Sequence, residues 1–295
     1  MPNVHSLPEN IFIAIFRHVP ISQLHSVSRV CREWSVHAFS VLYHRIFITP
    51  SVWSHFMQHQ IFQKYSSYCK ELIVYSINLT EQHKSLLLEH THDLNNLALL
   101  KCHNLDEDFL YDFTNKHSTT MEKLILWGPR SFESGVTILT DGLLRPSLPN
   151  MLNVRHLSIC AANISDEFLL LLVSTLTTNN VPSLIGLDLT ECWKLTAFGV
   201  AELFSNNLSS LRDVTLQYHK EKEIDVEFFE FLASNFATHR FEYVVTKNYL
   251  RYKVLIDFDK ISRDLNAIAN AHQNVTAVTR ENVWTDDEIV AKCND

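Results

Sequence analysis

Glycine is scarce in this sequence. The chain holds 5 glycines among 295 residues, whereas glycine makes up about 7% of an average protein. Folds that rely on glycine-rich turns are therefore disfavoured. The phosphate-binding loop patterns G-x-G-x-x-G and G-x-x-x-x-G-K-[ST] do not occur, so the sequence carries neither of these signatures of a nucleotide site.

Positive charge and long apolar runs are also limited. With 25 Lys and Arg against 33 Asp and Glu, the net charge is −8, and no basic run marks a nucleic-acid partner. The first residues lack the charged and apolar segments of a signal peptide, and no run approaches the ~18 apolar residues of a membrane span. We expect no nucleic-acid partner, no membrane partner, and a cytoplasmic and/or nuclear location.

The sequence has no C-x-x-C pair, so free thiols are expected rather than a disulfide framework or a zinc site. His90-Thr91-His92-Asp93 brings together possible metal ligands, but with 16 histidines in the chain we interpret it as chance clustering. No G-x-S-x-G nucleophile motif is present. We therefore predict that the chain is not an enzyme and has no catalytic residue, no cofactor and no bound metal. The cysteines are Cys31, Cys69, Cys102, Cys160, Cys192 and Cys293.

The first fifty residues carry an amphipathic helical pattern. Ile11, Ile15 and Val19 recur every four residues after Pro8, which predicts a helix with proline at its start. A unit of about fifty residues buries only a small core on its own, so apolar side chains on its surface indicate a partner. The residues that define the pattern are Leu7-Pro8, Ile11, Ile15-Phe16, Leu24, Val27, Val30-Cys31-Arg32 and Trp34.

In order and spacing these residues resemble the F-box motif, roughly L-P-x-x-[IL]-x-x-x-I-F…L-x-x-x-x-x-V-C-[RK]-x-W. The sequence departs from it at Ser22-Gln23, where an acidic residue is common, and at Val19-Pro20, where a leucine usually ends the helix. The resemblance implies a Skp-family linker protein as partner; the alternative is the ordinary core of a helical cap on a larger domain. The residues expected to bind the linker are Leu7, Pro8, Ile11, Ile15, Phe16, Leu24, Val27, Val30 and Trp34.

After residue 68 one short pattern recurs along the chain. Two apolar residues stand one apart, and in most copies another apolar residue lies three positions before the first. Successive copies are 25, 27, 33, 30 and 27 residues apart, a period typical of leucine-rich repeats, each a short strand followed by a helix. The first apolar residues of the copies are Leu72, Leu97, Leu124, Leu157, Leu187 and Val214.

Two copies resemble the cysteine-containing subtype of leucine-rich repeat, which commonly accompanies F-boxes: Leu97-x-Leu99-x-x-Cys102-x-x-Leu105 and Leu187-x-Leu189-x-x-Cys192-x-x-Leu195. The resemblance implies that Cys102 and Cys192 are structural residues packed inside the repeats. The implied fold is α/β: an N-terminal all-α F-box of about three helices, followed by a curved leucine-rich-repeat solenoid. The solenoid would have a parallel sheet on its concave face and helices on its convex face.

The predicted organisation has four parts. Residues 1–50 form the F-box domain, residues 51–68 a helical linker, residues 69–272 a solenoid of about six to eight irregular repeats, and residues 273–295 a C-terminal tail. Three of the 5 glycines and three of the 8 prolines lie between residues 128 and 149. This local concentration predicts an insertion in the repeat array near 128–149.

Side chains that alternate with the buried strand residues point away from the repeat core. In the first copies these are apolar or aromatic, and Tyr75 and Trp127 have the size of interface anchors. The alternative is that the F-box or the insertion covers them. The residues predicted to bind a target protein are Tyr75, Trp127, Asp188, Thr190 and Gln217.

An F-box followed by leucine-rich repeats implies, by family resemblance, a substrate-recruiting adaptor subunit of an SCF-type (Skp, cullin, F-box) ubiquitin ligase. The F-box would bind the Skp-family linker and through it cullin and RING subunits, while the repeats hold a protein substrate for ubiquitination and degradation. The alternative is a non-catalytic interaction scaffold that acts outside the ligase.

Overall fold

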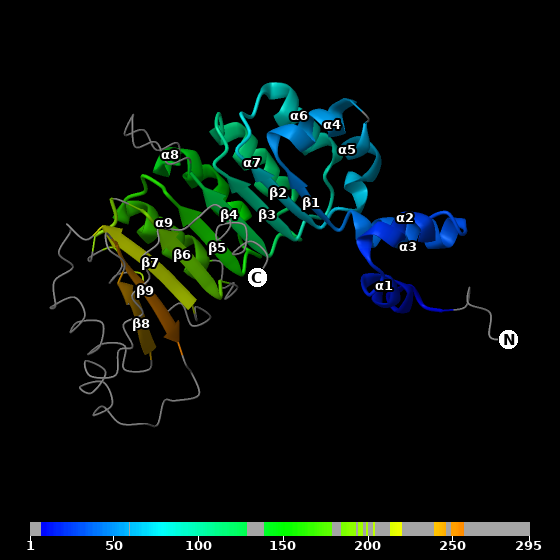
Figure 1. Cartoon of the computed structure of the whole chain (residues 1–295). Helices are drawn as coiled ribbons and strands as arrows, with labels where there is room; N and C mark the ends of the chain where they lie inside the picture. Colours follow the sequence, from blue (N-terminus) through cyan, green and yellow to red (C-terminus); the bar gives the residue numbers. More distant parts are fainter. Residues whose placement is uncertain are drawn as a thin grey trace.

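The computed structural model describes residues 7–58, 60–128, 139–178, 184–192, 194–196, 199, 203, 213–219, 239–245 and 249–256. Helices at the N-terminal end are followed by one long sheet with a row of helices beside it (Figure 1). The architecture is mixed α/β with a helical N-terminal region, and these two features of the predicted fold are confirmed. The predicted tail at 273–295 and residues 129–138 of the predicted insertion lie outside the described residues.

Three short helices form the N-terminal region: α1 (Glu9–Arg17), α2 (Ile21–Val27) and α3 (Arg32–Leu42). Pro8 and Pro20 occupy the N-cap positions of α1 and α2, where a missing backbone N–H costs nothing. Cys31 caps α3, because its Sγ accepts a hydrogen bond from the Trp34 N–H at 3.5 Å. The small core of this region is made by Phe12, Phe16, Leu24 and Ala38.

The strands form one sheet in which neighbours along the chain are neighbours in space. Strands β1 to β7 pair in parallel, and β9 and β8 then extend the sheet in antiparallel fashion. The bounds are β1 (Arg45–Ile48), β2 (Glu71–Tyr75), β3 (Asn96–Leu100), β4 (Lys123–Trp127), β5 (His156–Cys160), β6 (Gly186–Thr190), β7 (Asp213–His219), β8 (His239–Val245) and β9 (Tyr249–Ile256).

The recurring apolar positions found in the sequence occupy a single row across this sheet. Leu72 pairs with Leu97, and each later member pairs with the next, through to Val214. The row begins one strand earlier than the sequence pattern indicates, because Ile46 of β1 pairs with Leu72. Strand β1 thus belongs to the sheet although it lies within the segment predicted as the F-box domain.

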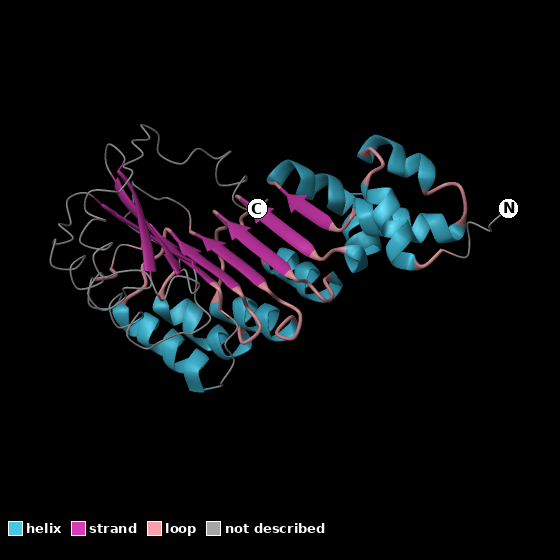
Figure 2. Ribbon diagram, turned by 90° about the horizontal axis from the view of Figure 1, so that it is seen from below, coloured by secondary structure: helices cyan, strands magenta, loops and turns pink. Residues whose placement is uncertain are grey.

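Helices connect the parallel strands, and Figure 2 shows them as a row along one face of the sheet. The residues predicted as a linker, 51–68, are the helical part of a first strand–helix unit that starts at β1. The connecting helices are α4 (Pro50–Gln58), α5 (Ile61–Tyr65), η2 (Ser66–Tyr68), α6 (Glu81–His90), α7 (Glu107–Lys116), α8 (Asp141–Leu144), η3 (Arg145–Asn150) and α9 (Asp166–Thr178).

The main core lies between the sheet and these helices. The buried thiols of Cys102 and Cys192 belong to it and donate hydrogen bonds to the carbonyl oxygens of Val74 at 3.4 Å and Ile159 at 3.0 Å. Burial raises the pKa of Cys102 to about 11, and it also raises the pKa of Cys192. Both thiols therefore stay protonated and link neighbouring strands, as expected for structural cysteines.

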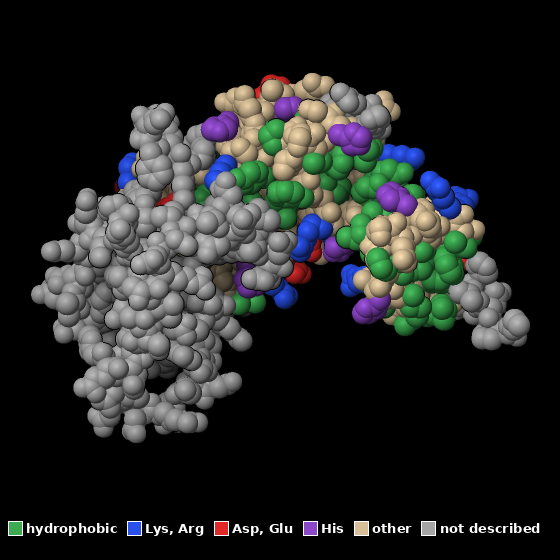
Figure 3. All heavy atoms as spheres, in the orientation of Figure 1, with side chains coloured by type: hydrophobic (Ala, Val, Ile, Leu, Met, Phe, Trp, Pro, Cys, Tyr) green, Lys and Arg blue, Asp and Glu red, His purple; other side chains and the backbone are tan. Residues whose placement is uncertain are grey.

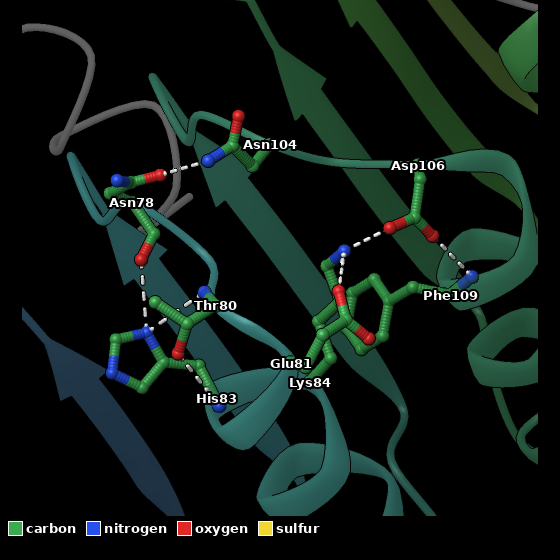
Figure 4. Close-up of polar contacts among 8 residues, drawn as sticks. All are labelled: Asn78, Thr80, Glu81, His83, Lys84, Asn104, Asp106 and Phe109. Carbon is green, nitrogen blue, oxygen red and sulfur yellow. Dashed lines mark hydrogen bonds and ion pairs between the residues drawn. The ribbon is translucent and has the colours of Figure 1, made fainter.

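Polar side chains fasten the loops of adjacent units to one another. Lys84 of α6 is 6% exposed and forms ion pairs with Glu81 and with Asp106 of the next unit (Figure 4). Asp106 also caps α7 by accepting the Phe109 N–H at 2.8 Å. In the next two units, Asp141 accepts the Ser165 N–H and Asp166 accepts the Thr196 N–H, each at 2.9 Å. The carboxylates thus satisfy loop N–H groups that helices leave unpaired.

Several strands are followed directly by a residue in the left-handed region that usually favours glycine. Ser76, Lys101, Ala161 and Glu191 have φ values between 51° and 59°. The equivalent residue after β4 is Gly128, where an added Cβ would lie 2.4 Å from the Ala161 carbonyl oxygen. Glycine is therefore used here for close backbone approach, while other residues occupy the left-handed positions.

Ser76→Gly is expected to raise the free energy of unfolding by up to about 1 kcal/mol, because glycine relieves left-handed strain at an exposed position. Ser67→Gly, at an exposed position in η2 without positive φ, is the matched control and should be destabilising. Urea unfolding of the three proteins measures both effects. A lower stability for Ser76→Gly would contradict the strain argument.

The buried His117 side chain makes stability depend on pH. Its Nδ1 accepts the Leu94 N–H at 3.3 Å and its Nε2 lies 3.1 Å from Thr91 Oγ1, an arrangement that needs the neutral ring. Burial lowers the pKa of His117 to about 4. The unfolded chain, with a histidine pKa near 6.5, then binds a proton that the folded chain does not.

Stability should therefore be fully present above about pH 6.5 and fall by up to about 3 kcal/mol as pH drops toward 4. His117→Gln should be less stable at neutral pH and should lose less stability on acidification. His103→Gln, at an exposed position, is the control that should retain the wild-type slope. Denaturant unfolding at several pH values decides between these outcomes; equal slopes for wild type and His117→Gln would refute the assignment.

Candidate functional site

The N-terminal helices expose large apolar side chains. Ile11 and Ile15, one turn apart on α1, are 41% and 49% exposed, and Val30 is 62% exposed. Figure 3 shows apolar side chains gathered over these helices. Clustered apolar exposure of this kind is typical of a protein-binding surface. We call these residues the N-terminal apolar surface: Leu7, Pro8, Ile11, Ile15, Ile21 and Val30.

The nine residues expected to bind the linker protein divide into three groups. Five are exposed (Leu7, Pro8, Ile11, Ile15 and Val30), whereas Val27 and Trp34 are partly buried. Phe16 and Leu24 are 3% and 1% exposed and belong to the core of the three helices. Their position indicates that they support the exposed residues from below.

Phe12 is a core residue that sequence reasoning missed. It is 2% exposed, and its ring packs 6.0 Å from Phe16, 6.4 Å from Trp34 and 5.0 Å from His37, measured between ring centroids. The four-residue spacing of Phe12 and Phe16, offset by one from Ile11 and Ile15, is the signal that could have found it. Aromatic side chains therefore fill the inner face of α1 and aliphatic ones its outer face.

Aromatic rings join the N-terminal helices to α5 of the first strand–helix unit. Tyr43 stacks on Tyr65 with ring centroids 4.3 Å apart and an interplanar angle of 6°, and Phe39 lies 4.8 Å from Tyr65. Two residues after α3, the His44 carbonyl accepts the N–H groups of Lys70 and Glu71 at 2.8 and 3.0 Å. The chain passes from α3 into β1 with two intervening residues, so these contacts fix the N-terminal apolar surface relative to the sheet.

Charged groups also meet at this junction. Arg45 Nε donates to the Glu71 carboxylate at 2.5 Å, and His44 Nε2 lies 3.6 Å from the same carboxylate. Burial lowers the pKa of His44, a shift that Glu71 opposes. At neutral pH the Arg45–Glu71 pair is therefore the main electrostatic contact between β1 and β2.

The face of the sheet away from the main core is called here the outer face. Its apolar side chains form a separate cluster, in which Trp127 is 2% exposed and Leu100 is fully buried. The alternation that predicted their direction is therefore correct, but these side chains do not contribute open surface. The cluster comprises Ile73, Ala98, Leu100, Ile125, Trp127, Cys160 and Ala161, with the partly exposed Tyr75 packed against it.

The residues predicted to bind a target have different surroundings. Tyr75 is partly exposed, whereas Trp127, Asp188 and Thr190 are 2%, 6% and 0% exposed. Asp188 Oδ1 accepts hydrogen bonds from Thr190 N at 3.1 Å and Thr190 Oγ1 at 2.6 Å. The side chain of Gln217 lies outside the described residues. Of the five, Tyr75 alone has a described position from which it can contact a partner.

Phe47 of β1 is an accessible outer-face residue that sequence reasoning missed. It is 37% exposed, and its ring centroid lies 6.3 Å from that of Tyr75. Its assignment to the F-box segment hid it from the strand alternation.

Within the described ranges no group of three His, Cys, Asp or Glu side chains could hold a metal ion, and no described helix is long and apolar enough to span a membrane.

Comparison with known families identifies the N-terminal region. Residues 4–49 match the family model F-box-like, and this match supports assignment to the F-box protein family. F-box domains in general bind Skp1-type linker proteins and belong to adaptors that are not catalytic. No curated protein sequence matches the chain.

The division of the apolar residues between core and surface leads to a stability prediction. Phe12→Ala should lower the free energy of unfolding of the N-terminal region by about 3–5 kcal/mol, because it leaves a cavity among aromatic rings. Ile15→Ala should change it by less than about 1 kcal/mol, because the side chain is half exposed. Thermal unfolding of the two variants tests this, and similar losses for both would disprove the division.

Proposed function

We propose that this chain is the substrate-recruiting adaptor subunit of an SCF-type ubiquitin ligase. In this role the N-terminal apolar surface binds a Skp-family linker protein, which connects the chain to cullin and RING subunits. The sheet and its helices form a leucine-rich-repeat solenoid that holds a protein substrate for ubiquitination and degradation. The observation that carries the proposal is the exposure of Leu7, Pro8, Ile11, Ile15 and Val30 within a segment that matches F-box-like domains.

Burial of this surface supplies the driving force for linker binding. Each aliphatic side chain removed from water contributes about 25 cal/mol per Å² of apolar area, and the packed rings beneath hold the side chains in place before binding. A rigid surface loses little conformational entropy on association, which favours affinity. The proposed site of action is the cytoplasm and/or the nucleus, where such a ligase has access to its targets.

The repeat assignment rests on the regularity of the strand–helix units. The first apolar residues of successive units are register partners across parallel strands, and buried cysteines follow β3 and β6 at the same position. Repeat arrays of this kind provide extended binding surfaces. A target held there would be at high effective concentration near the ubiquitin-charged subunit, so this chain needs no catalytic group of its own.

The double variant Ile11→Asp/Ile15→Asp is expected to lose linker binding by at least a hundredfold, because two carboxylates would be desolvated against an apolar partner. Both positions are exposed, so the fold should persist. Isothermal titration of the full chain with a purified Skp-family linker gives the affinity. Leu170→Asp, at a 38% exposed position on α9, is the matched control that should bind like wild type.

Unchanged linker affinity in the double variant would refute the F-box assignment. Co-purification of cullin with the wild-type chain and the linker distinguishes a ligase subunit from an interaction scaffold. A ternary complex that forms with the linker and excludes cullin would support the scaffold instead.

A further inference from the structure

The outer face of the sheet keeps a polar row accessible at the beginning of its strands. These residues are register partners from strand to strand, and all of them are exposed or partly exposed, in contrast to the buried apolar cluster beside them. The row consists of Arg45, Glu71, Asn96, Lys123 and His156.

Next to this row, at the end of the sheet closest to the N-terminal helices, lies an aromatic pair with a cation. Phe47 and Tyr75 are both accessible, with ring centroids 6.3 Å apart. The Lys101 ammonium lies 5.6 Å from the centroid of the Tyr75 ring and 3.5 Å from its hydroxyl oxygen. The rings offer apolar contact area, and the ammonium adds a positive charge at their edge.

The charge of this region is opposite in sign to that of the whole chain. Among the described residues, the accessible side chains on the outer face of β1 to β5 and in the turns that flank these strands include more cations than carboxylates: Arg45, Lys70, Lys101, Lys123 and Arg155 against Glu71, Asp93 and Glu122. Glu71 pairs with Arg45 at 2.5 Å, and Asp93 pairs with Lys70 at 3.9 Å. The chain as a whole has a net charge of −8. A locally positive surface on an acidic protein attracts acidic segments and repels basic ones.

We propose that Arg45, Phe47, Tyr75, Lys101 and Lys123 form a binding strip for an acidic peptide segment of the target. An apolar side chain of the segment packs on Phe47 and Tyr75, while its carboxylates pair with Lys101 and Lys123. Three strand spacings, about 14 Å, separate β1 from β4, and Lys101 lies five residues, about 16 Å, along the strand direction from the level of Lys123, so an extended segment of about six or seven residues spans the strip. This inference rests on the proposed function, because it specifies the class of target that the adaptor recruits.

Selection from a display library of short random peptides tests the strip, with the full chain bound to its Skp-family linker as bait. The wild-type chain should enrich peptides in which Asp or Glu flanks Leu, Ile or Phe. The variant Lys101→Glu/Lys123→Glu should bind an enriched peptide about tenfold more weakly and select basic residues instead. Lys64→Glu/Lys116→Glu, an equal charge change at exposed positions on the helical side in α5 and α7, should retain wild-type affinity.

Failure to enrich acidic peptides, or unchanged selection by the double lysine variant, would overturn the inference. Linker affinity measured on the same variants separates this result from failure of the proposed function. If the linker binds normally while acidic peptides are ignored, the strip is wrong and the F-box role stands. If the linker does not bind wild type, the proposed function itself fails.

Discussion

The structure depends on one constraint: a single strand–helix unit of about 28 residues cannot bury its own apolar face. Leu72 of β2 is covered on one side by Ile46 and on the other by Leu97, and the same relation holds along the row to Val214. Each unit thereby completes the core of its neighbour, so stability is shared between adjacent units. The regular register is a direct result, because a shift of one residue would turn each buried leucine to the outer face.

The same constraint accounts for the way the N-terminal helices meet the sheet. A parallel array needs a first unit with one unpaired side, and β1 provides it directly after α3. The aromatic stack of Tyr43 on Tyr65 packs the end of α3 against α5 of this first unit. The N-terminal apolar surface and the outer face of the sheet are consequently held in one arrangement, which suits a protein whose proposed role is to hold two partners at a fixed separation.

The sequence predicted the periodic features of the fold well because they arise from local rules. Spacing of apolar residues located the strands, and alternation correctly assigned Trp127 to the face away from the main core. Alternation states the direction of a side chain but not what covers it, so the burial of Trp127 could not be foreseen. The position of β1 was missed for a related reason: its four residues continue the F-box motif without a break in composition.

Within the N-terminal region, the resemblance to the F-box motif located the apolar surface but did not distinguish its exposed residues from the buried residues beneath them. Phe16 and Leu24 belong to the same motif as Ile11 and Ile15, yet they are buried beneath them. A motif records all positions that a domain needs, both those that shape the surface and those that form it. Separating the two requires the packing of α1 against α3, and that packing depends on Phe12, whose contacts with Trp34 and His37 span 22 and 25 positions in the chain.

The scarcity of glycine connects the fold to the proposed binding strip. Since Ser76, Lys101, Ala161 and Glu191 take the left-handed turn positions, each turn gains a side chain that glycine would not provide. At Lys101 that side chain reaches the Tyr75 ring and brings a positive charge to the outer face. Backbone strain of about 1–2 kcal/mol per residue is offset by the stacking of units. In return, the turn after β3 carries a charged group that can distinguish one partner from another.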